Sequence, residues 1–214
     1  GNVIISIDPL PTVCMVTGGG SYCAGGAGMH VGLNTSVAGI SYQLMTGASP
    51  VGTPLAGSGS SLDFGLQTAA GTYTVIATNS TTGCQSTMGG GAIVSINALP
   101  LTYTTTGGGS YCAGTTGVHI GLGGSNSGIN YQLYNGSSFV LSPVSGTGSS
   151  LDFGLITAAG TYSVIATNSS TGCTNTMTGT ATVTITATVT PTVSHTVSPN
   201  DSVCAGTTVT FNAT

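Results

Sequence analysis

The strongest constraint on the fold of this 214-residue chain is an internal repeat with a period of 89 residues. Nine residues that begin at Thr17, TGGGSYCAG, recur unchanged from Thr106, and the register then holds without a gap to Ile96 and Ile185. A fixed period indicates that one structural unit has been copied head to tail. This period is too long for a solenoid repeat and suits one small β-sandwich, so the sequence predicts two consecutive small domains.

The repeat also sets the expected domain boundaries. We place the first complete copy at residues 12–99 and the second at residues 100–188. Residues 1–11 match the last strand of a preceding copy, and residues 189–214 contain the start of a third, divergent copy. We therefore expect the chain to be a segment of a longer array. Its short joints carry proline, as in residues 97–102, which predicts a stiff rod with limited bending.

Each copy has the hydrophobic pattern of β-strands. Apolar residues alternate with polar ones in short runs bounded by Gly, Ser, Thr and Pro, and these runs recur in both copies. In the first copy the runs cover residues 29–33, 40–44, 62–64, 73–78 and 93–96. No stretch sustains the period of a helix. Six or seven short strands in a unit of this length predict an all-β fold of tandem immunoglobulin-like β-sandwich domains.

A local signature supports the immunoglobulin-like assignment. Residues 62–79, LDFGLQTAAGTYTVIATN, resemble the passage from strand E to strand F of immunoglobulin-like domains, where a tyrosine hydroxyl bonds back across the corner. This resemblance makes Tyr73 and Tyr162 the corner tyrosines. The F-strand cysteine and the core tryptophan of antibody domains are absent, so we expect Tyr42 and Tyr131 to fill the core.

The chain contains no Lys or Arg, and four Asp residues are its only acidic side chains. Since phosphate neutralisation needs Lys or Arg, this composition excludes nucleic acid as a partner. It also removes every trypsin site, which predicts a chain that persists in a protease-rich exterior; rapid trypsin digestion of the native protein would contradict this. The sequence has no apolar run long enough to span a bilayer, so we predict no membrane insertion of these residues.

The six cysteines follow the repeat. Cys23 and Cys84 are separated by 61 positions, and so are Cys112 and Cys173. Equal spacing in two copies predicts one disulfide within each domain, and hence an oxidising compartment. Cys204 is the first cysteine of the next copy, so its partner is expected outside this sequence.

Cys14 stands outside this pattern, because Tyr103 occupies its place in the second copy. Three alternatives are open for Cys14. It is a free buried thiol, it bonds to a partner outside this sequence, or the cysteine pairs rearrange locally.

The ionisable residues give no sign of a catalytic or metal site. His30 and His119 are equivalent, as are Asp63 and Asp152, and neither histidine has a second histidine or a carboxylate cluster nearby. Metal sites need several ligands, so we predict no metal and no cofactor, with the histidines on strand faces and the aspartates capping turns. His195 lies in a Thr- and Pro-rich linker and is expected to be solvated. Without a G-x-S-x-G elbow or an acid–base pair, we predict that the chain is not an enzyme.

The repeat resembles a known group of proteins through the phrase GGGSYCAG…GLNTSVAGISYQL…SLDFGLQTAAGTYTVIATNSTTGC. Similar immunoglobulin-like repeats occur in very large secreted proteins of Bacteroidota, which the type IX system exports and which act as surface adhesins or gliding-motility fibres. The resemblance covers both complete copies and implies extracellular display at the cell surface. It also makes Ser202 a candidate for O-glycosylation, since Asp-Ser-Val matches the short pattern that Bacteroidota modify.

Together these features predict an extracellular structural stalk or fibre of a cell-surface adhesin, acting as a protease-resistant spacer whose partners are the neighbouring repeats. Two alternatives are open. Each copy binds surface glycans, for which Tyr22, Tyr111 and Tyr134 are the available aromatics. Otherwise identical chains pack laterally into an extracellular filament or sheath.

Overall fold

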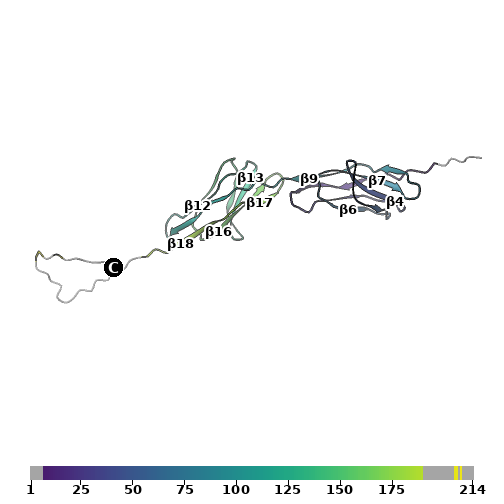
Figure 1. The fold of residues 1–214 in the computed structure, drawn as a ribbon. Helices are drawn as coiled ribbons and strands as arrows, with labels where there is room; N and C mark the ends of the chain where they lie inside the picture. Colours follow the sequence, from purple (N-terminus) through teal and green to yellow (C-terminus); the bar gives the residue numbers. More distant parts are fainter. Residues whose placement is uncertain (1–6, 190–204, 207, 209–214) are drawn as a thin grey trace, which may run out of the picture.

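The computed structural model describes residues 7–189, 205, 206 and 208. The described residues form strands and no helix, in two sets that lie end to end as separate elongated bodies (Figure 1). The first set is β1 (Val16–Gly18), β2 (Gly20–Cys23), β3 (Met29–Leu33), β4 (Ile40–Thr46), β5 (Ser49–Ala56), β6 (Leu62–Gln67), β7 (Gly71–Asn79), β8 (Gln85–Thr87) and β9 (Ala92–Asn97). The second is β10 (Thr105–Gly107), β11 (Gly109–Cys112), β12 (Val118–Leu122), β13 (Ile129–Asn135), β14 (Ser138–Ser145), β15 (Leu151–Ile156), β16 (Gly160–Asn168), β17 (Thr174–Thr176) and β18 (Ala181–Thr186).

Each set folds into a two-sheet sandwich. In the first sandwich one sheet has the order β1-β3-β6 and the other β2-β9-β7-β4-β5, with β8 also paired to β7. The second sandwich repeats this order as β10-β12-β15 and β11-β18-β16-β13-β14, with β17 on β16. All pairs are antiparallel except β2 with β9 and β11 with β18. This topology, in which the first strand divides between the two sheets, is of immunoglobulin type, which confirms the predicted all-β sandwich fold.

The two sets of strands fall within residues 12–99 and 100–188, the boundaries that the repeat predicts. Those boundaries, and the wider array, stay predictions. Residues 1–6 and nearly all of residues 190–214, where we expect parts of two further copies, lie outside the described residues. Cys204, Ser202 and His195 are therefore not described.

The glycine triplet of each repeat lies where the first strand changes sheet. Gly18 ends β1 with a φ of 89°, and an added Cβ would lie 2.1 Å from His30 O on the neighbouring strand β3. Gly107 has the same surroundings, with His119 O at the same distance. Only glycine fits this conformation and this close approach, so the recurring motif has a structural cause.

The tyrosines that the sequence assigns to the core are fully buried. Tyr42 and Tyr131 have no exposed surface, and their hydroxyl oxygens accept the N–H of Val37 and Asn126, each at 2.9 Å. Both belong to the core clusters of their sandwiches, as predicted.

The tyrosine corners are also confirmed. The hydroxyl of Tyr73 donates to Ala69 O at 2.8 Å, and that of Tyr162 donates to Ala158 O at 2.7 Å. Each bond crosses the turn that leads into β7 or β16. The bond fixes the start of the longest strand of its sandwich.

Candidate functional site: the joint between the two sandwiches

The chain passes from the first sandwich to the second through a short, anchored joint. Strand β9 ends at Asn97, and Pro100 is already buried against the second sandwich. The side-chain amide of Asn175, in β17, donates to Pro100 O at 2.8 Å. Only Ala98 and Leu99 therefore lie between the end of β9 and a residue held by the second sandwich, which leaves the joint little freedom.

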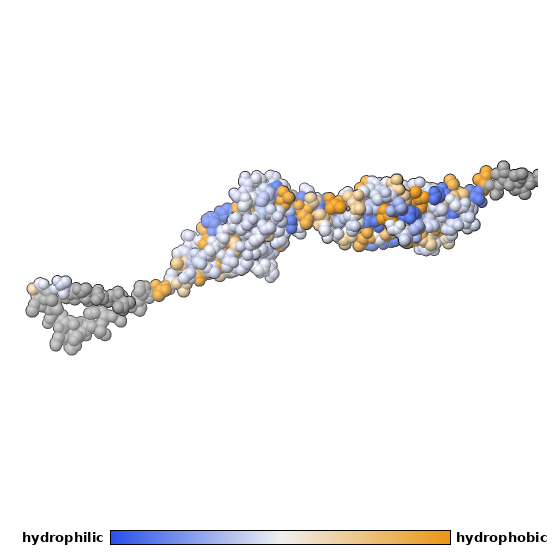
Figure 2. Space-filling view, viewed as in Figure 1, coloured by the Kyte–Doolittle hydropathy of each residue, from blue (hydrophilic) through white to orange (hydrophobic). Residues whose placement is uncertain are grey.

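Apolar side chains gather at the narrow waist between the two bodies (Figure 2). Ile96, Leu99 and Leu101 are all partly exposed there. The waist therefore leaves apolar surface exposed to solvent.

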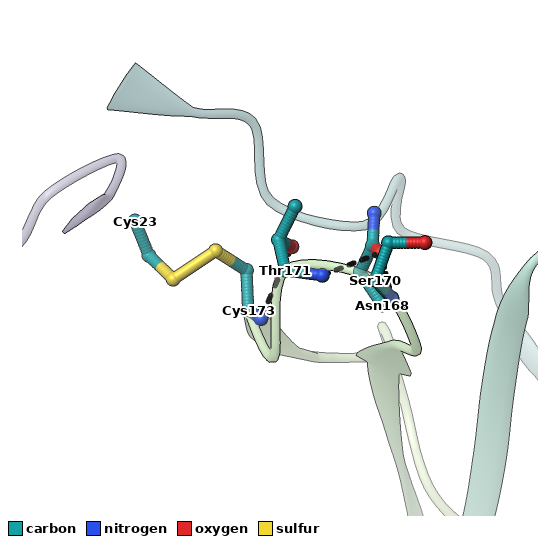
Figure 3. Close-up of a disulfide and its surroundings, with 5 residues drawn as sticks. All are labelled: Cys23, Asn168, Ser170, Thr171 and Cys173. Atoms are coloured by element: carbon teal, nitrogen blue, oxygen red, sulfur yellow. Dashed lines mark hydrogen bonds between the residues drawn. A yellow bond between two sulfur atoms is a disulfide. The ribbon is translucent and has the colours of Figure 1, made fainter. Parts of the chain in front are cut away.

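A disulfide crosses this joint. Cys23, the last residue of β2, is bonded to Cys173, with 5.6 Å between the two Cα atoms and 150 residues between them in sequence (Figure 3). Cys23 lies beside Asn97 in the parallel pair of β2 and β9, so it marks the end of the first sandwich from which the chain leaves. Cys173 is fully buried and belongs to the turn between β16 and β17.

The turn that carries Cys173 is held by its own side chains (Figure 3). Asn168 Oδ1 accepts the N–H groups of Ser170 and Thr171 at 2.9 and 3.2 Å, and Thr171 Oγ1 accepts the N–H of Cys173 at 3.3 Å. An asparagine that bonds to the backbone two and three residues ahead stabilises a tight turn. The Sγ atom of Cys173 is thus held by a well-defined turn at the end of the second sandwich that faces the joint.

The disulfides predicted within each domain, Cys23 with Cys84 and Cys112 with Cys173, are wrong in this structure. Cys84 lies in the turn between β7 and β8, and its Sγ is 4.0 Å from Asp8 O, at the end where the chain enters the first sandwich. Cys23 lies at the opposite end. Cys84 and Cys112 are both unbonded. The equal spacing of the pairs arises from the copying of one unit and does not reflect their proximity.

Cys14 is a free, buried thiol, the first of its three alternatives. Its backbone N–H points to Met88 Sδ at 3.2 Å, and the N–H of the equivalent Tyr103 points to Met177 Sδ at 3.3 Å. The Tyr103 hydroxyl additionally donates to Asn126 Oδ1 at 2.9 Å. Both residues therefore fill the same place beside the core, and Cys14 has no part in the joint.

The equivalent histidines and aspartates form one exposed pair on each sandwich. Nδ1 of His30 lies 2.7 Å from Asp63 Oδ2, and the same distance separates His119 from Asp152. The sequence pattern did not indicate this single carboxylate partner, because a register shift in the β3–β6 and β12–β15 pairs places each aspartate on the same face as its histidine. Turn capping by the aspartates is confirmed: Asp63 Oδ1 accepts the N–H of Gly65 at 2.8 Å.

Each of these pairs consists of one imidazole and one carboxylate. Within the described ranges, no group of three or more His, Cys, Asp or Glu side chains could hold a metal ion. Nor does this part of the chain contain a helix able to cross a lipid bilayer.

The aromatics considered for glycan binding differ in their surroundings. The hydroxyls of Tyr22 and Tyr111 donate to Thr68 O and Thr157 O, and both rings are half-buried against the cores. Tyr134 lies on the β13–β14 hairpin opposite Phe139, whose side chain is 76% exposed. The first sandwich has Met45 and Pro50 at these two positions, so the aromatic hairpin is not repeated.

No protein-family model and no curated protein matches this chain. Among solved structures, it is similar to one chain of the complex of a mouse coronavirus receptor-binding domain with its murine receptor, at 16% identity over 80% of this chain and 100% of that one, with a TM-score of 0.43. It is also similar to murine CEACAM1b, at 16% identity over 80% of this chain and 100% of that one, with a TM-score of 0.38. A third similar structure holds the fibronectin(III)-like modules of Clostridium thermocellum CbhA, at 13% identity over 80% of this chain and 95% of that one, with a TM-score of 0.39. At these identities and TM-scores nothing is transferred to this chain, and the fold assignment rests on its own strand topology.

Proposed function

We propose that this chain is part of an extracellular stalk or fibre of tandem immunoglobulin-like repeats from a cell-surface adhesin, in which it acts as a spacer. The observation that carries the proposal is the Cys23–Cys173 bond, which links consecutive sandwiches end to end. A spacer keeps its reach only if its domains do not fold back on one another. A linker alone leaves rotation about its bonds, whereas a linker and a disulfide together attach the two sandwiches at two points and remove most of that freedom.

Composition supports an exposed, oxidising location for this spacer. Disulfides persist mainly outside the cytosol, and a chain without Lys or Arg offers no site to trypsin-like proteases. These properties agree with the resemblance to Bacteroidota repeats exported by the type IX system. In this proposal the partners of each sandwich are the neighbouring repeats, and the chain performs no catalysis.

The edge strands favour a single-chain stalk over a laterally packed filament. β5 and β14 each form one edge of the larger sheet of their sandwich, and the short strands β2 and β11 form the other edge; unpaired backbone groups at an edge could recruit another chain. β5 carries Pro50 and Pro54, and β14 carries Pro143. Proline lacks the N–H that an added strand would need, so the β5 and β14 edges resist pairing between chains.

The spacer proposal is tested by small-angle X-ray scattering on the full 214-residue chain. We expect the oxidised protein to have a narrow distance distribution with the maximum dimension of two sandwiches in line. Cys23→Ser should broaden that distribution and shorten its mean, because the joint then bends about Ala98 and Leu99 alone. Cys112→Ser, which removes an exposed free thiol, is the matched control and should leave the curve unchanged.

Two results would overturn the proposal. One is an oxidised chain whose scattering is as broad as that of the Cys23→Ser variant. The other is specific, saturable binding of the chain on a glycan array, which would make recognition, and not reach, the function of the repeat.

A further inference from the structure

The two unbonded surface cysteines occupy the same places as the two bonded ones. In the 89-residue register, Cys84 of the first sandwich corresponds to Cys173 of the second, and Cys112 of the second corresponds to Cys23 of the first. Each sandwich therefore carries one cysteine at the end where the chain enters and one at the end where it leaves. The bond that crosses the joint uses one of each kind.

The turn that carries Cys84 has the same internal bonds as the turn that carries Cys173. Asn79 Oδ1 accepts the N–H groups of Thr81 and Thr82 at 2.9 and 3.2 Å, and Thr82 Oγ1 accepts the N–H of Cys84 at 3.3 Å. These distances equal those around Cys173. Cys84 is therefore presented by the same fixed loop, at the entry end of the first sandwich.

The segment that Cys84 contacts is a second, independent indication of its partner. Its Sγ lies 4.0 Å from Asp8 O, and Asp8 corresponds in the repeat to Asn97. Asn97 is the residue beside which Cys23 lies in the β2–β9 pair. In a preceding repeat of the same build, the cysteine equivalent to Cys23 would lie beside Asp8, within reach of Cys84.

At the end where the chain leaves the second sandwich, Cys112 has the same backbone pairing as Cys23 has in the first. Cys112 ends β11 beside Thr186 of β18, as Cys23 ends β2 beside Asn97 of β9. Ala113 N–H donates to Thr186 O at 2.9 Å, and Ala24 N–H donates to Asn97 O at the same distance. Cys112 is exposed and unbonded.

We propose that Cys84 and Cys112 form disulfides with the equivalent cysteines of the preceding and following repeats, so that every sandwich is bonded to both neighbours. The proposal rests on the tandem array of the proposed function. Each bond forms by thiol–disulfide exchange: two cysteine thiols give up two protons and two electrons, and a protein or small-molecule disulfide takes them up and becomes two thiols.

Such a ladder of bonds, one across each joint, would limit how far the array can be extended. A pulling force that crosses from Cys23 to Cys173 re-enters the backbone and follows it for 31 residues to Cys204, where it can cross again. Fully extended, those 31 residues span at most about 110 Å for every two repeats. Each folded sandwich is already about 30 Å long, from its nine-residue strand. Unfolding two bonded sandwiches would thus add about 50 Å, whereas two sandwiches without the bonds would add about 560 Å.

The test is a four-sandwich chain made by joining residue 188 of one copy to residue 11 of a second, which preserves the 89-residue register. The chain is oxidised in a glutathione buffer, alkylated, digested with pepsin and mapped by mass spectrometry. We expect a bond from Cys112 of the first copy to Cys84 of the second, together with Cys23–Cys173 in both copies. Replacing Cys84 of the second copy with Ser is the control, and should leave Cys112 of the first copy alkylated and both Cys23–Cys173 bonds intact.

The proposal is overturned if Cys112 of the first copy is alkylated, or is bonded to any other cysteine, while both Cys23–Cys173 bonds form. Those two bonds also report that the sandwiches have folded. The outcome is separate from that of the scattering experiment. A straight two-sandwich chain with a free Cys112 rejects the ladder but not the stalk, whereas a complete ladder with a bent joint rejects the stalk.

Discussion

The two sandwiches share their strand order and register but differ at the end of one strand. In the first sandwich, β6 ends at Gln67, a buried polar residue whose side-chain amide donates to Phe64 O and Gly65 O at 3.1 and 3.2 Å. The second sandwich has Ile156 at this place, buried with Phe153 in the core cluster. Phe64, the counterpart of Phe153, is only half-buried. The second sandwich therefore buries more apolar surface here.

The strand register is the same in both sandwiches despite this difference. In the first sandwich, Phe64 and Gln67 line an open groove with Val51 and Leu55, between β5 and β6. The joint is equally unaffected, since both sandwiches present the same cysteine-bearing ends. This repeat therefore keeps its strand arrangement and its cysteine-bearing ends, while single core positions vary in chemistry and stability.

The largest expected effect is mechanical and comes from the bond at the joint. When the chain is pulled by its termini, the Cys23–Cys173 bond shields the 150 residues between them from the force. The oxidised chain should therefore release about 500 Å less contour length than the Cys23→Ser variant in single-molecule force spectroscopy. In that variant two unfolding steps should appear, one for each sandwich. If the oxidised chain released the same contour length as the Cys23→Ser variant, the bond would not carry the force.

The next effect is a loss of stability at alkaline pH. Burial raises the pKa of Tyr42 above its usual 10.0, although the Val37 N–H partly opposes this, and the nearby Cys14 raises it further. Burial also raises the pKa of Tyr131 and Tyr162, against the opposing hydrogen bonds from Asn126 and Asn135. Above about pH 10 the unfolded chain loses these protons first, so stability is complete below that pH and falls as pH rises, by about 1.4 kcal/mol per unit for each tyrosine affected.

Urea denaturation between pH 8 and pH 11.5 measures this loss. Tyr131→Phe should lower the stability of the second sandwich at pH 8, because the Asn126 N–H loses its acceptor, but should flatten its decline at high pH. Tyr42→Phe should do the same in the first sandwich. An unchanged slope in both variants would contradict the assignment of the decline to these buried tyrosines.

Features that depend on one copy could be predicted from the sequence. The alternation of apolar residues gives the strands, and the corner stretch places Tyr73 and Tyr162, because both signals are local. Burial of Tyr42 and Tyr131 follows from the same alternation. The pairing of His30 with Asp63 is different, since it depends on a register shift between two strands that are distant in sequence.

The disulfide was missed because a repeat makes two pairings look alike. Cys84 and Cys173 are one period apart, so spacing favours neither as the partner of Cys23. Strand direction distinguishes them. β7 runs antiparallel to β9, so the turn after β7 lies at the entry end, whereas β2 runs parallel to β9 and ends at the exit. A prediction that had traced these directions would have placed Cys23 and Cys84 at opposite ends.

A smaller effect is expected when Gln67 and Ile156 are exchanged. Gln67→Ile should stabilise the first sandwich by about 1 kcal/mol, since added apolar burial outweighs two hydrogen bonds to partly exposed carbonyls. Ile156→Gln should destabilise the second by about 2 to 3 kcal/mol, because it opens a cavity and buries an amide. Hydrogen exchange followed by mass spectrometry reports on each sandwich separately. Stability changes of equal size and opposite sign would mean that Gln67 and Ile156 have the same surroundings, which would contradict the structure.

The smallest effect should come from the exposed histidine–aspartate pairs, and it should be the same in both sandwiches. Asp63→Ala and Asp152→Ala each remove a turn cap and a histidine contact of equal length. The aspartates are 58% exposed, so solvent screens them and each substitution should cost about 1 kcal/mol or less. His30→Gln and His119→Gln, which leave the cap in place, should cost less still. Urea denaturation measures all four, and a cost confined to one sandwich would show that its pair has a further contact.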